Sequence, residues 1–195
     1  MGLCIGLKEK DNVYIGCDSH MFSNKATSKN PNNFKVWNVL NVDNAIMACQ
    51  GTIRDANAIK VIPNLIDDYD VVKKNIDYRF VLKNIAFRIK DALKDECFYE
   101  RKDGIFDALE SGYLFGYQDK LYEITSGLCV LEVDYFSCLG SGTNEEIGSL
   151  DDTNGEDPYK RIEKALRAAS KTDNTMHFPF VILDTKSQKF KIIEK

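Results

Sequence analysis

Alternating apolar and polar residues predict that the chain begins with two β-hairpins. Residues 3–8 and 13–17 each have the period of a half-buried strand, and the polar residues 10–12 form a turn between them. Residues 19–33 have the composition of a loop, rich in Ser, Asn and Lys. A second pair of apolar segments within residues 34–49 predicts the second hairpin.

The period then changes from that of a strand to that of a helix. Apolar positions keep helical spacing from Ile53 until Pro63, which ends or kinks the segment. A longer helix follows, and Asp77 is its predicted N-cap. One apolar face of this second helix is formed by Phe80, Val81, Ile85, Ile89 and Leu93.

Strand patterns return in the second half of the chain. Residues 111–126 predict a hairpin that turns at Gln118 and Asp119, and residues 129–142 predict a further strand or turn. A short helix is expected near residues 143–150. These segments repeat the order of the first half, in which strands precede helices.

The last helix has the clearest start signal in the sequence. Asp157 is its predicted N-cap, and Pro158 suits the first helical position. Residues 178–195 then predict a final hairpin. Strands, two helices, strands, two helices and strands follow one another, and both sheets need helices on their outer faces. The sequence therefore predicts an α+β layered sandwich, with one domain over residues 1–195.

Composition and charge exclude several classes of protein. The 195 residues carry a net charge of −4, and Lys and Arg are interspersed with Asp and Glu, so no nucleic-acid partner is expected. No apolar segment approaches the roughly 18 to 20 residues of a membrane-spanning helix, and no signal peptide is visible. We therefore expect a cytoplasmic protein with no membrane partner.

The six cysteines include no CxxC pair, and most of them lie inside apolar strand segments. This placement is typical of reduced, packed thiols rather than of a disulfide framework or a zinc site. The two histidines, His20 and His177, are far apart in the sequence and do not indicate a metal site. No cofactor is expected.

Six segments carry a family resemblance. In chain order they are YIGCDSH, KVWNV, MACQGTIRDA, GYQDKLYEI, CLGSGTNEEIGSL and RIEKALRAASKTD. Together with the order of the elements, they resemble the proteasome β-subunit and HslV family of the N-terminal nucleophile (Ntn) hydrolases, from residue 2 to about residue 185. The resemblance implies a four-layer αββα sandwich of two antiparallel sheets covered by helices, ring assembly, and an N-terminal threonine nucleophile whose own amino group is the base.

The resemblance also implies a set of catalytic positions. Lys35 falls where the family has its active-site lysine, and Asp18 falls where the aspartate partner of that lysine stands. Gly51 matches the glycine whose backbone N–H builds the oxyanion site, and Ser141 and Asp173 match two residues beside the nucleophile. A threonine hydroxyl needs a base, and a nearby ammonium lowers the pKa of the groups around it, so that a free amine can act near neutral pH.

The nucleophile itself is missing. Counting back along the first hairpin places the threonine position at Gly2, which has no side chain, and no propeptide precedes it. Met176 and His177 stand where the family has a serine and a glycine. Met21 and Trp37 occupy positions of the specificity pocket, and we expect them to fill it.

Structural roles for the same residues stay open. Asp18 and Lys35 can form a buried ion pair without a catalytic role. Gly51 can serve only as a strand-to-helix turn, while Ser141 and Asp173 can be turn and cap residues.

Three hypotheses about function follow. The first, which Gly2 favours, is a catalytically silent subunit of a homo-oligomer or proteasome-like ring, with an ATPase unfoldase as a conceivable partner. The second is an active Ntn amidohydrolase or peptidase that uses Cys4 or an atypical N-terminus on a peptide substrate, although Cys4 lies too close to Asp18 for this. The third is a membrane anchor with Gly2 myristoylated and Cys4 palmitoylated, which Gly6 contradicts because the motif requires Ser or Thr there. Whether the chain is an enzyme stays open.

Overall fold

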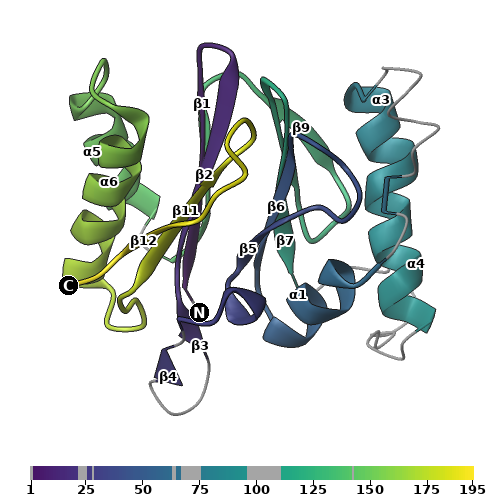
Figure 1. Ribbon diagram of the computed structural model, residues 1–195, viewed down its shortest axis with the longest axis horizontal. Coiled ribbons are helices and arrows are strands. Elements are labelled where there is room, and N and C mark those ends of the chain that lie inside the picture. The colour runs from purple at the N-terminus through teal and green to yellow at the C-terminus, as the bar shows by residue number, and fades with distance from the viewer. Residues whose placement is uncertain are drawn as a thin grey trace.

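Two five-stranded sheets lie face to face, and helices cover their outer faces (Figure 1). The computed structural model describes residues 2–21, 26–27, 29–62, 65–66, 76–95, 111–141 and 143–195. The order of layers is helices, sheet, sheet, helices. The predicted α+β fold, a four-layer αββα sandwich of two antiparallel sheets, is confirmed.

The first sheet contains the first and the last strands of the chain. In spatial order, its strands are β10 (Phe136–Gly140), β1 (Leu3–Glu9), β2 (Asn12–Asp18), β11 (Phe180–Asp184) and β12 (Lys191–Ile193). The first predicted hairpin is confirmed, and its turn consists of Lys10 and Asp11 only. Lys10 has a φ of 57°, as a tight turn between antiparallel strands requires.

The second sheet is built from the middle of the chain. In spatial order, its strands are β5 (Val36–Asn38), β6 (Ala45–Gln50), β7 (Gly112–Tyr117), β8 (Lys120–Ile124) and β9 (Val130–Val133). The hairpin with a turn at Gln118 and Asp119 is confirmed. β9 and β10 follow each other in sequence, but the chain crosses from the second sheet to the first between them, at residues 134 and 135.

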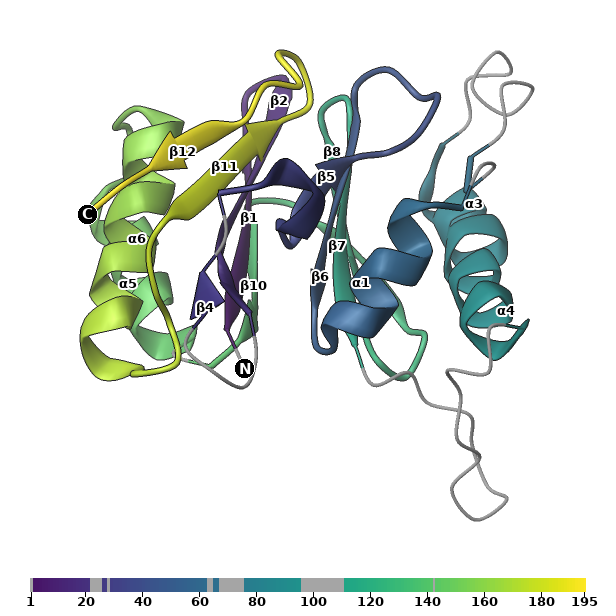
Figure 2. The same ribbon diagram turned by 60° about the horizontal axis from the view of Figure 1, so that its bottom comes forward.

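Each sheet has its own pair of helical segments (Figure 2). The first sheet is covered by α5 (Thr143–Asp152) and α6 (Pro158–Thr172). The second sheet is covered by α1 (Ile53–Lys60) and by the continuous segment of α3 (Tyr78–Phe80), η2 (Val81–Ala86) and α4 (Phe87–Asp95). Both predicted N-caps are confirmed, because the Asp77 side chain accepts from the Phe80 N–H and the Asp157 side chain accepts from the Lys160 N–H.

The apolar residues separate into three cores, one between each pair of layers. The apolar face predicted for the helix after Asp77 is confirmed: Val81, Ile85, Ile89 and Leu93 are buried and Phe80 is half-buried against the second sheet. On α6, the residues that face the first sheet are Ile162, Ala165, Leu166 and Ala169. The space between the sheets is filled by small and branched side chains, among them Cys4, Ile15, Val36 and Leu114.

The loop predicted over residues 19–33 is partly wrong. Its ends form the short strands β3 (His20–Met21) and β4 (Ala26–Thr27), which pair with each other, and a 3-10 turn, η1 (Pro31–Asn33). Strands of two residues are too short to show a period, so no pattern in the sequence indicates them. Pro63, the predicted end or kink of the first helix, lies outside the described residues. No helix in the described part of the chain is long and apolar enough to cross a bilayer.

Candidate functional site

Gly2 lies at the start of β1 and is buried. Its carbonyl oxygen accepts a hydrogen bond from the Ser141 N–H, with an N–O distance of 3.4 Å. Gly140 has a φ of 125°, and a Cβ atom at this position would lie 2.0 Å from the Gly2 oxygen. A glycine is therefore required at position 140 for the end of β10 to approach the start of β1 this closely.

Lys35 and Asp18 form an ion pair that joins the two sheets. The Lys35 Nζ lies 2.8 Å from Asp18 Oδ1, and the two side chains are 12% and 0% exposed. Asp18 ends β2, whereas the Lys35 carbonyl oxygen accepts from the Cys49 N–H of β6 at 3.0 Å. The Leu3 N–H also donates to Asp18 Oδ1, at 2.8 Å. The carboxylate thus holds both the lysine and the first residue of β1.

Two opposing effects act on the pKa of Lys35. Burial is the largest single effect and lowers this pKa, but the charge of Asp18, its hydrogen bond and the nearby thiols of Cys4 and Cys17 together raise the pKa above its ordinary value. The lysine therefore stays a charged ammonium over the whole physiological range of pH. In this state it can stabilise negative charge, but it cannot accept a proton.

The Lys35 ammonium occupies the space that a side chain at position 2 would need. A Cβ atom added to Gly2 would lie 2.0 Å from the Lys35 Nζ and 2.5 Å from Asp18 Oδ1. The structure therefore brings together three of the residues that the resemblance assigned to the catalytic centre. It also shows that the space a side chain at position 2 would need is filled by Lys35 and Asp18.

Ser141 joins the backbone of Gly2 to the side chain of Asp173. The Ser141 hydroxyl donates to Asp173 Oδ2. Asp173 is the C-cap of α6, and its other oxygen accepts from the N–H and the hydroxyl of Thr175, each at 2.7 Å. Burial raises the pKa of Asp173, but the hydrogen bonds from Ser141 and Thr175 together lower it by more. The net shift of the pKa is therefore downward. Asp173 thus caps α6, as its structural role predicts, and it also binds the Ser141 hydroxyl.

Gly51 forms the turn between β6 and α1. Its φ is 152°, and a Cβ atom there would lie 2.1 Å from the Ser111 Oγ and 2.7 Å from the Ser111 Cα. The buried Ser111 hydroxyl accepts from the Thr52 N–H at 3.0 Å and donates to the Asp55 carboxylate at 2.7 Å. This network fixes the turn that carries Gly51.

Only part of this hydrogen-bond network has a signal in the sequence. Thr52 is the N-cap of α1 and accepts from the Asp55 N–H at 3.3 Å. A threonine followed three residues later by an acidic residue is a helix-start signal that indicates this cap. Nothing in the sequence places Ser111 beside it, because Ser111 belongs to a segment 59 residues from Thr52.

Beside Gly51 and Lys35 lies a shallow depression, which we call the Gly51 hollow. The space inside it is about 10 Å³, which is room for about one water molecule. It is lined by Asn33, Phe34, Lys35, Cys49, Gly51, Thr52, Ile53, Ala56, Asn57 and Lys60.

Lys60 closes one side of the Gly51 hollow. Its ammonium donates to the carbonyl oxygens of Phe34 and of Asn32, the latter at 3.0 Å, and lies 5.3 Å from the centre of the Trp37 ring. Burial lowers the pKa of Lys60 to about 8. Trp37 belongs to the core between the second sheet and its helices, and it is not among the residues that line the Gly51 hollow. That it fills a specificity pocket stays a prediction. The Met21 side chain lies outside the described residues.

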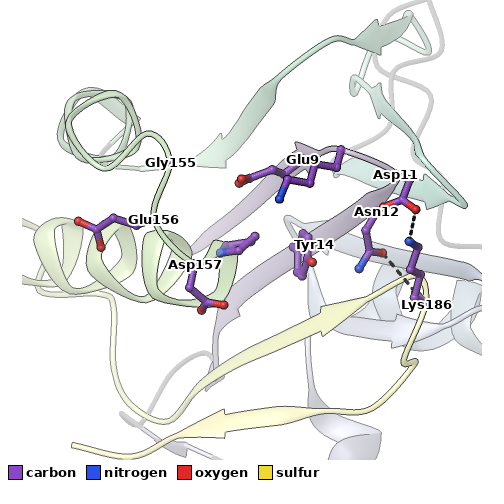
Figure 3. A pocket seen from close by; sticks show the side chains of 10 residues that line it. Glu9, Asp11, Asn12, Tyr14, Gly155, Glu156, Asp157 and Lys186 are labelled. Carbon is purple, nitrogen blue, oxygen red and sulfur yellow. Dashed lines mark hydrogen bonds and ion pairs between the residues drawn. The ribbon is translucent and has the colours of Figure 1, made fainter.

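A larger depression, which we call the far groove, lies at the other end of the β1–β2 hairpin (Figure 3). Its volume is about 380 Å³, and it is lined by Glu9, Lys10, Asp11, Asn12, Tyr14, Gly155, Glu156, Asp157, Pro158 and Lys186. Glu9 is seven residues along β1 from Gly2, a distance of roughly 23 Å at about 3.3 Å per residue. Within the described ranges, no three His, Cys, Asp or Glu side chains are grouped so that they could hold a metal ion.

The sandwich and the residues at its first strand together define a class of protein. The start of β1, a lysine–aspartate pair and a serine–aspartate pair meet at one end of two covered sheets, and the sandwich itself has the proteasome-like fold. The chain belongs to the proteasome subunit family, whose model matches residues 2–182. Among curated protein sequences, none matches the chain significantly.

Solved structures support the same fold. BPH from Thiobacillus denitrificans superposes with a TM-score of 0.69 at 14% identity, over 94% of this chain and 97% of that chain. Anbu, an ancestral beta-subunit, from Yersinia bercovieri gives 0.72 at 9% identity, over 99% and 87%. Anbu from Hyphomicrobium sp. strain MC1 gives 0.67 at 12% identity, over 98% and 87%. At these identities the likeness concerns the fold alone.

Proposed function

We propose that this chain is a catalytically silent subunit of a proteasome-like assembly. The observation that supports the proposal is the glycine at position 2, beside a lysine ammonium that fills the space of a side chain there. Lys35 and Asp18 lie beside Gly2, and Ser141 contacts both the Gly2 carbonyl oxygen and Asp173. Gly51 lines the same hollow as Lys35. Position 2 itself has no hydroxyl or thiol, so these groups have no nucleophile to activate.

In this proposal the retained residues have a structural role. The Lys35–Asp18 pair ties the start of β1 to both sheets, and the Ser141–Asp173 pair ties the end of β10 to α6. The Gly51 hollow leaves room for about one water molecule, far less than a peptide side chain needs. A closed pocket agrees with a subunit that does not bind peptide at this position.

Family membership supports the oligomeric part of the proposal. Several large apolar side chains are exposed on the outer elements of the chain, among them Tyr78, Phe87, Leu131 and Ile147. Such residues are suited to contacts between subunits. We propose a homo-oligomer or a ring shared with related subunits, and an ATPase unfoldase as partner only of a ring that contains active subunits.

The alternative of a peptidase that uses Cys4 has no support in the geometry. The Cys4 side chain is completely buried in the core between the sheets. Burial raises the pKa of its thiol well above the ordinary value, and the neighbouring Cys17 raises it further. A buried, protonated thiol is a poor nucleophile.

An electrophilic inhibitor tests the silent subunit. BPH from Thiobacillus denitrificans has been solved in complex with epoxomicin, so epoxomicin is a suitable probe. We expect no increase in the intact mass of this protein, measured by mass spectrometry, after incubation with epoxomicin. The matched control is Gly2→Thr with Met1 removed, where the threonine displaces the flexible end of Lys35 and becomes labelled. An adduct on the unsubstituted protein contradicts the proposal.

Native mass spectrometry tests assembly separately. We expect species that contain several copies of the chain. A strict monomer at micromolar concentration contradicts the oligomeric part of the proposal, whatever the result with epoxomicin.

A further inference from the structure

Two cysteines face each other on the strands that form the candidate site. Cys4 of β1 and Cys17 of β2 are direct register partners, and their Sγ atoms lie 2.8 Å apart. Both thiols are free and both side chains are completely buried. Cys4 is two residues after Gly2, and Cys17 immediately precedes Asp18.

The register places this pair where a disulfide can form. The two-residue turn makes Glu9 and Asn12 the hydrogen-bonded pair that closes the hairpin. Hydrogen-bonded and non-hydrogen-bonded pairs alternate along an antiparallel ladder, so Cys4 and Cys17, five positions further, form a non-hydrogen-bonded pair. The Cα atoms of such a pair are about 4.5 Å apart, which is within the range that disulfides accept. Only a small movement of the two sulfur atoms is needed.

In the reduced form, the two thiols belong to a chain of contacts between the sheets. The Cys17 thiol donates to the Cys4 Sγ, and the Cys4 thiol donates to the carbonyl oxygen of Cys49 on β6, at 3.6 Å. Burial raises the pKa of Cys4, so the closed fold protects it from alkylation. Cys4 is nevertheless close to the start of β1, and opening of a strand end exposes its first residues to solvent.

We propose that Cys4 and Cys17 form a reversible disulfide. This redox modification site lies on the same two strands as Gly2 and Asp18. A glutathione disulfide supplies the oxidising equivalents. When the start of β1 opens, the Cys4 thiol becomes exposed and loses its proton to solvent. The thiolate then attacks one sulfur atom of the glutathione disulfide, which releases one glutathione and leaves a mixed disulfide. The Cys17 thiolate then attacks the Cys4 sulfur and releases the second glutathione, so that two protein thiols are oxidised as one glutathione disulfide is reduced to two thiols.

Oxidation changes two contacts at the site. It adds a covalent bond between β1, which follows Gly2, and β2, which ends at Asp18. It also removes the S–H group that donates to the Cys49 carbonyl oxygen, and with it one link between the two sheets. A non-hydrogen-bonded cross-strand disulfide lies at the short end of the allowed Cα distances, so we expect it to be readily reduced.

The test uses the full chain with Cys97→Ser and Cys129→Ser, because Cys129 is exposed and Cys97 lies outside the described residues. The protein is equilibrated at graded ratios of oxidised to reduced glutathione, quenched with acid, unfolded and alkylated. We expect a mass loss of about 2 Da before alkylation, for two hydrogen atoms, and a peptide that links positions 4 and 17. Dithiothreitol should reverse both changes. The oxidised form should melt roughly 5 to 10 °C higher than the reduced form.

Two variants sharpen the result. Cys17→Ala should abolish the link, whereas Cys49→Ala, which removes the other buried thiol near Cys4, should keep it. If Cys17→Ala does not fold, the peptide map of the parent protein decides alone. Full alkylation of Cys4 and Cys17 at the most oxidising ratio, a stable mixed disulfide with glutathione, or a link from Cys4 to Cys49 would each overturn the proposal. None of these readouts depends on whether the protein is catalytically silent.

Discussion

The two ends of the β1–β2 hairpin differ in how much space they leave. At the Gly2 end, the Gly51 hollow leaves about 10 Å³, and lysine side chains from two sides fill the rest. At the turn end, the far groove has about 380 Å³ and is bordered by the exposed Asp11–Lys186 ion pair. The end at which the Lys35–Asp18 and Ser141–Asp173 pairs lie is therefore the closed one. Among the described residues, the larger open space lies at the opposite end of the hairpin.

The largest effect should come from removing the charge of Asp18. Asp18→Asn leaves the mostly buried Lys35 ammonium without its counter-charge. Breaking a buried pair by removing one partner costs about 3–5 kcal/mol. We expect a loss of this size in the free energy of unfolding, measured by urea denaturation.

Asp11→Asn is the matched control at the other end of the hairpin. It breaks the ion pair with Lys186, whose two side chains are 79% and 52% exposed, for Asp11 and Lys186 respectively. We expect no measurable change in stability, because solvent screens such a pair. Equal effects of Asp18→Asn and Asp11→Asn would show that the two ends do not differ in the way described.

A smaller effect should follow a change at Gly51. Gly51→Ala places a Cβ atom 2.7 Å from the Ser111 Cα, at a φ of 152°. Because backbone atoms must move, we expect a loss of about 2–4 kcal/mol in the free energy of unfolding. Gly155→Ala in the far groove is the control, since its φ is 88° but no atom lies within 4 Å of the added Cβ. It should cost only about 1 kcal/mol, for the backbone conformation alone. A smaller loss for Gly51→Ala than for Gly155→Ala would contradict tight packing at the Gly2 end.

The smallest expected effect is a pH dependence of the free energy of unfolding. It arises from α5, the helix that follows Ser141 in the chain. Glu146 of α5 is completely buried, and neither carboxylate oxygen has a hydrogen-bond partner among the described residues. Burial, and then the charge of Glu145, raise the pKa of Glu146 from 4.5 to about 8, and Cys138 and Asp173 are its other titratable neighbours. The folded state therefore binds this proton more tightly than the unfolded state, so the stability contributed by Glu146 falls as the pH rises from about 4.5 to about 8.

Glu146→Gln removes this titration. At pH 6 the variant should be more stable than the parent protein by about 2 kcal/mol, and at pH 4 the difference should be close to zero. Thermal unfolding at a series of pH values measures both. Asp152→Asn, at an exposed position near the end of the same helix, is the control and should leave the pH profile of the parent unchanged. A parallel pH profile for Glu146→Gln would show that Glu146 is not protonated at neutral pH.

Most of the fold could be predicted from the sequence because its signals are local. Turns and caps such as Gln118–Asp119, Asp77 and Asp157 are decided by a few neighbouring residues. The chain crossing between β9 and β10 could not be predicted, because both strands have the same apolar pattern and only tertiary packing assigns them to different sheets. The pairing of β3 with β4 is likewise too short to leave a pattern.

The candidate site shows the same limit. The proximity of Lys35 to Asp18, and of Ser141 to Asp173, followed from the family resemblance. The closure of the Gly51 hollow by Lys60 did not, because a lysine near the end of a helix gives no sign of the direction of its side chain. Contacts between distant segments had to come from the structure.

The Lys35–Asp18 pair has a consequence for how the sandwich comes apart. One charge belongs to a strand of the first sheet and the other to the segment that enters the second, so separating the sheets would expose two unmatched charges and open the core between them. Unfolding should then be cooperative across both halves, with no state in which one sheet survives alone. Fluorescence of Trp37, the one tryptophan of the chain, should follow the same transition as the loss of secondary structure in both sheets.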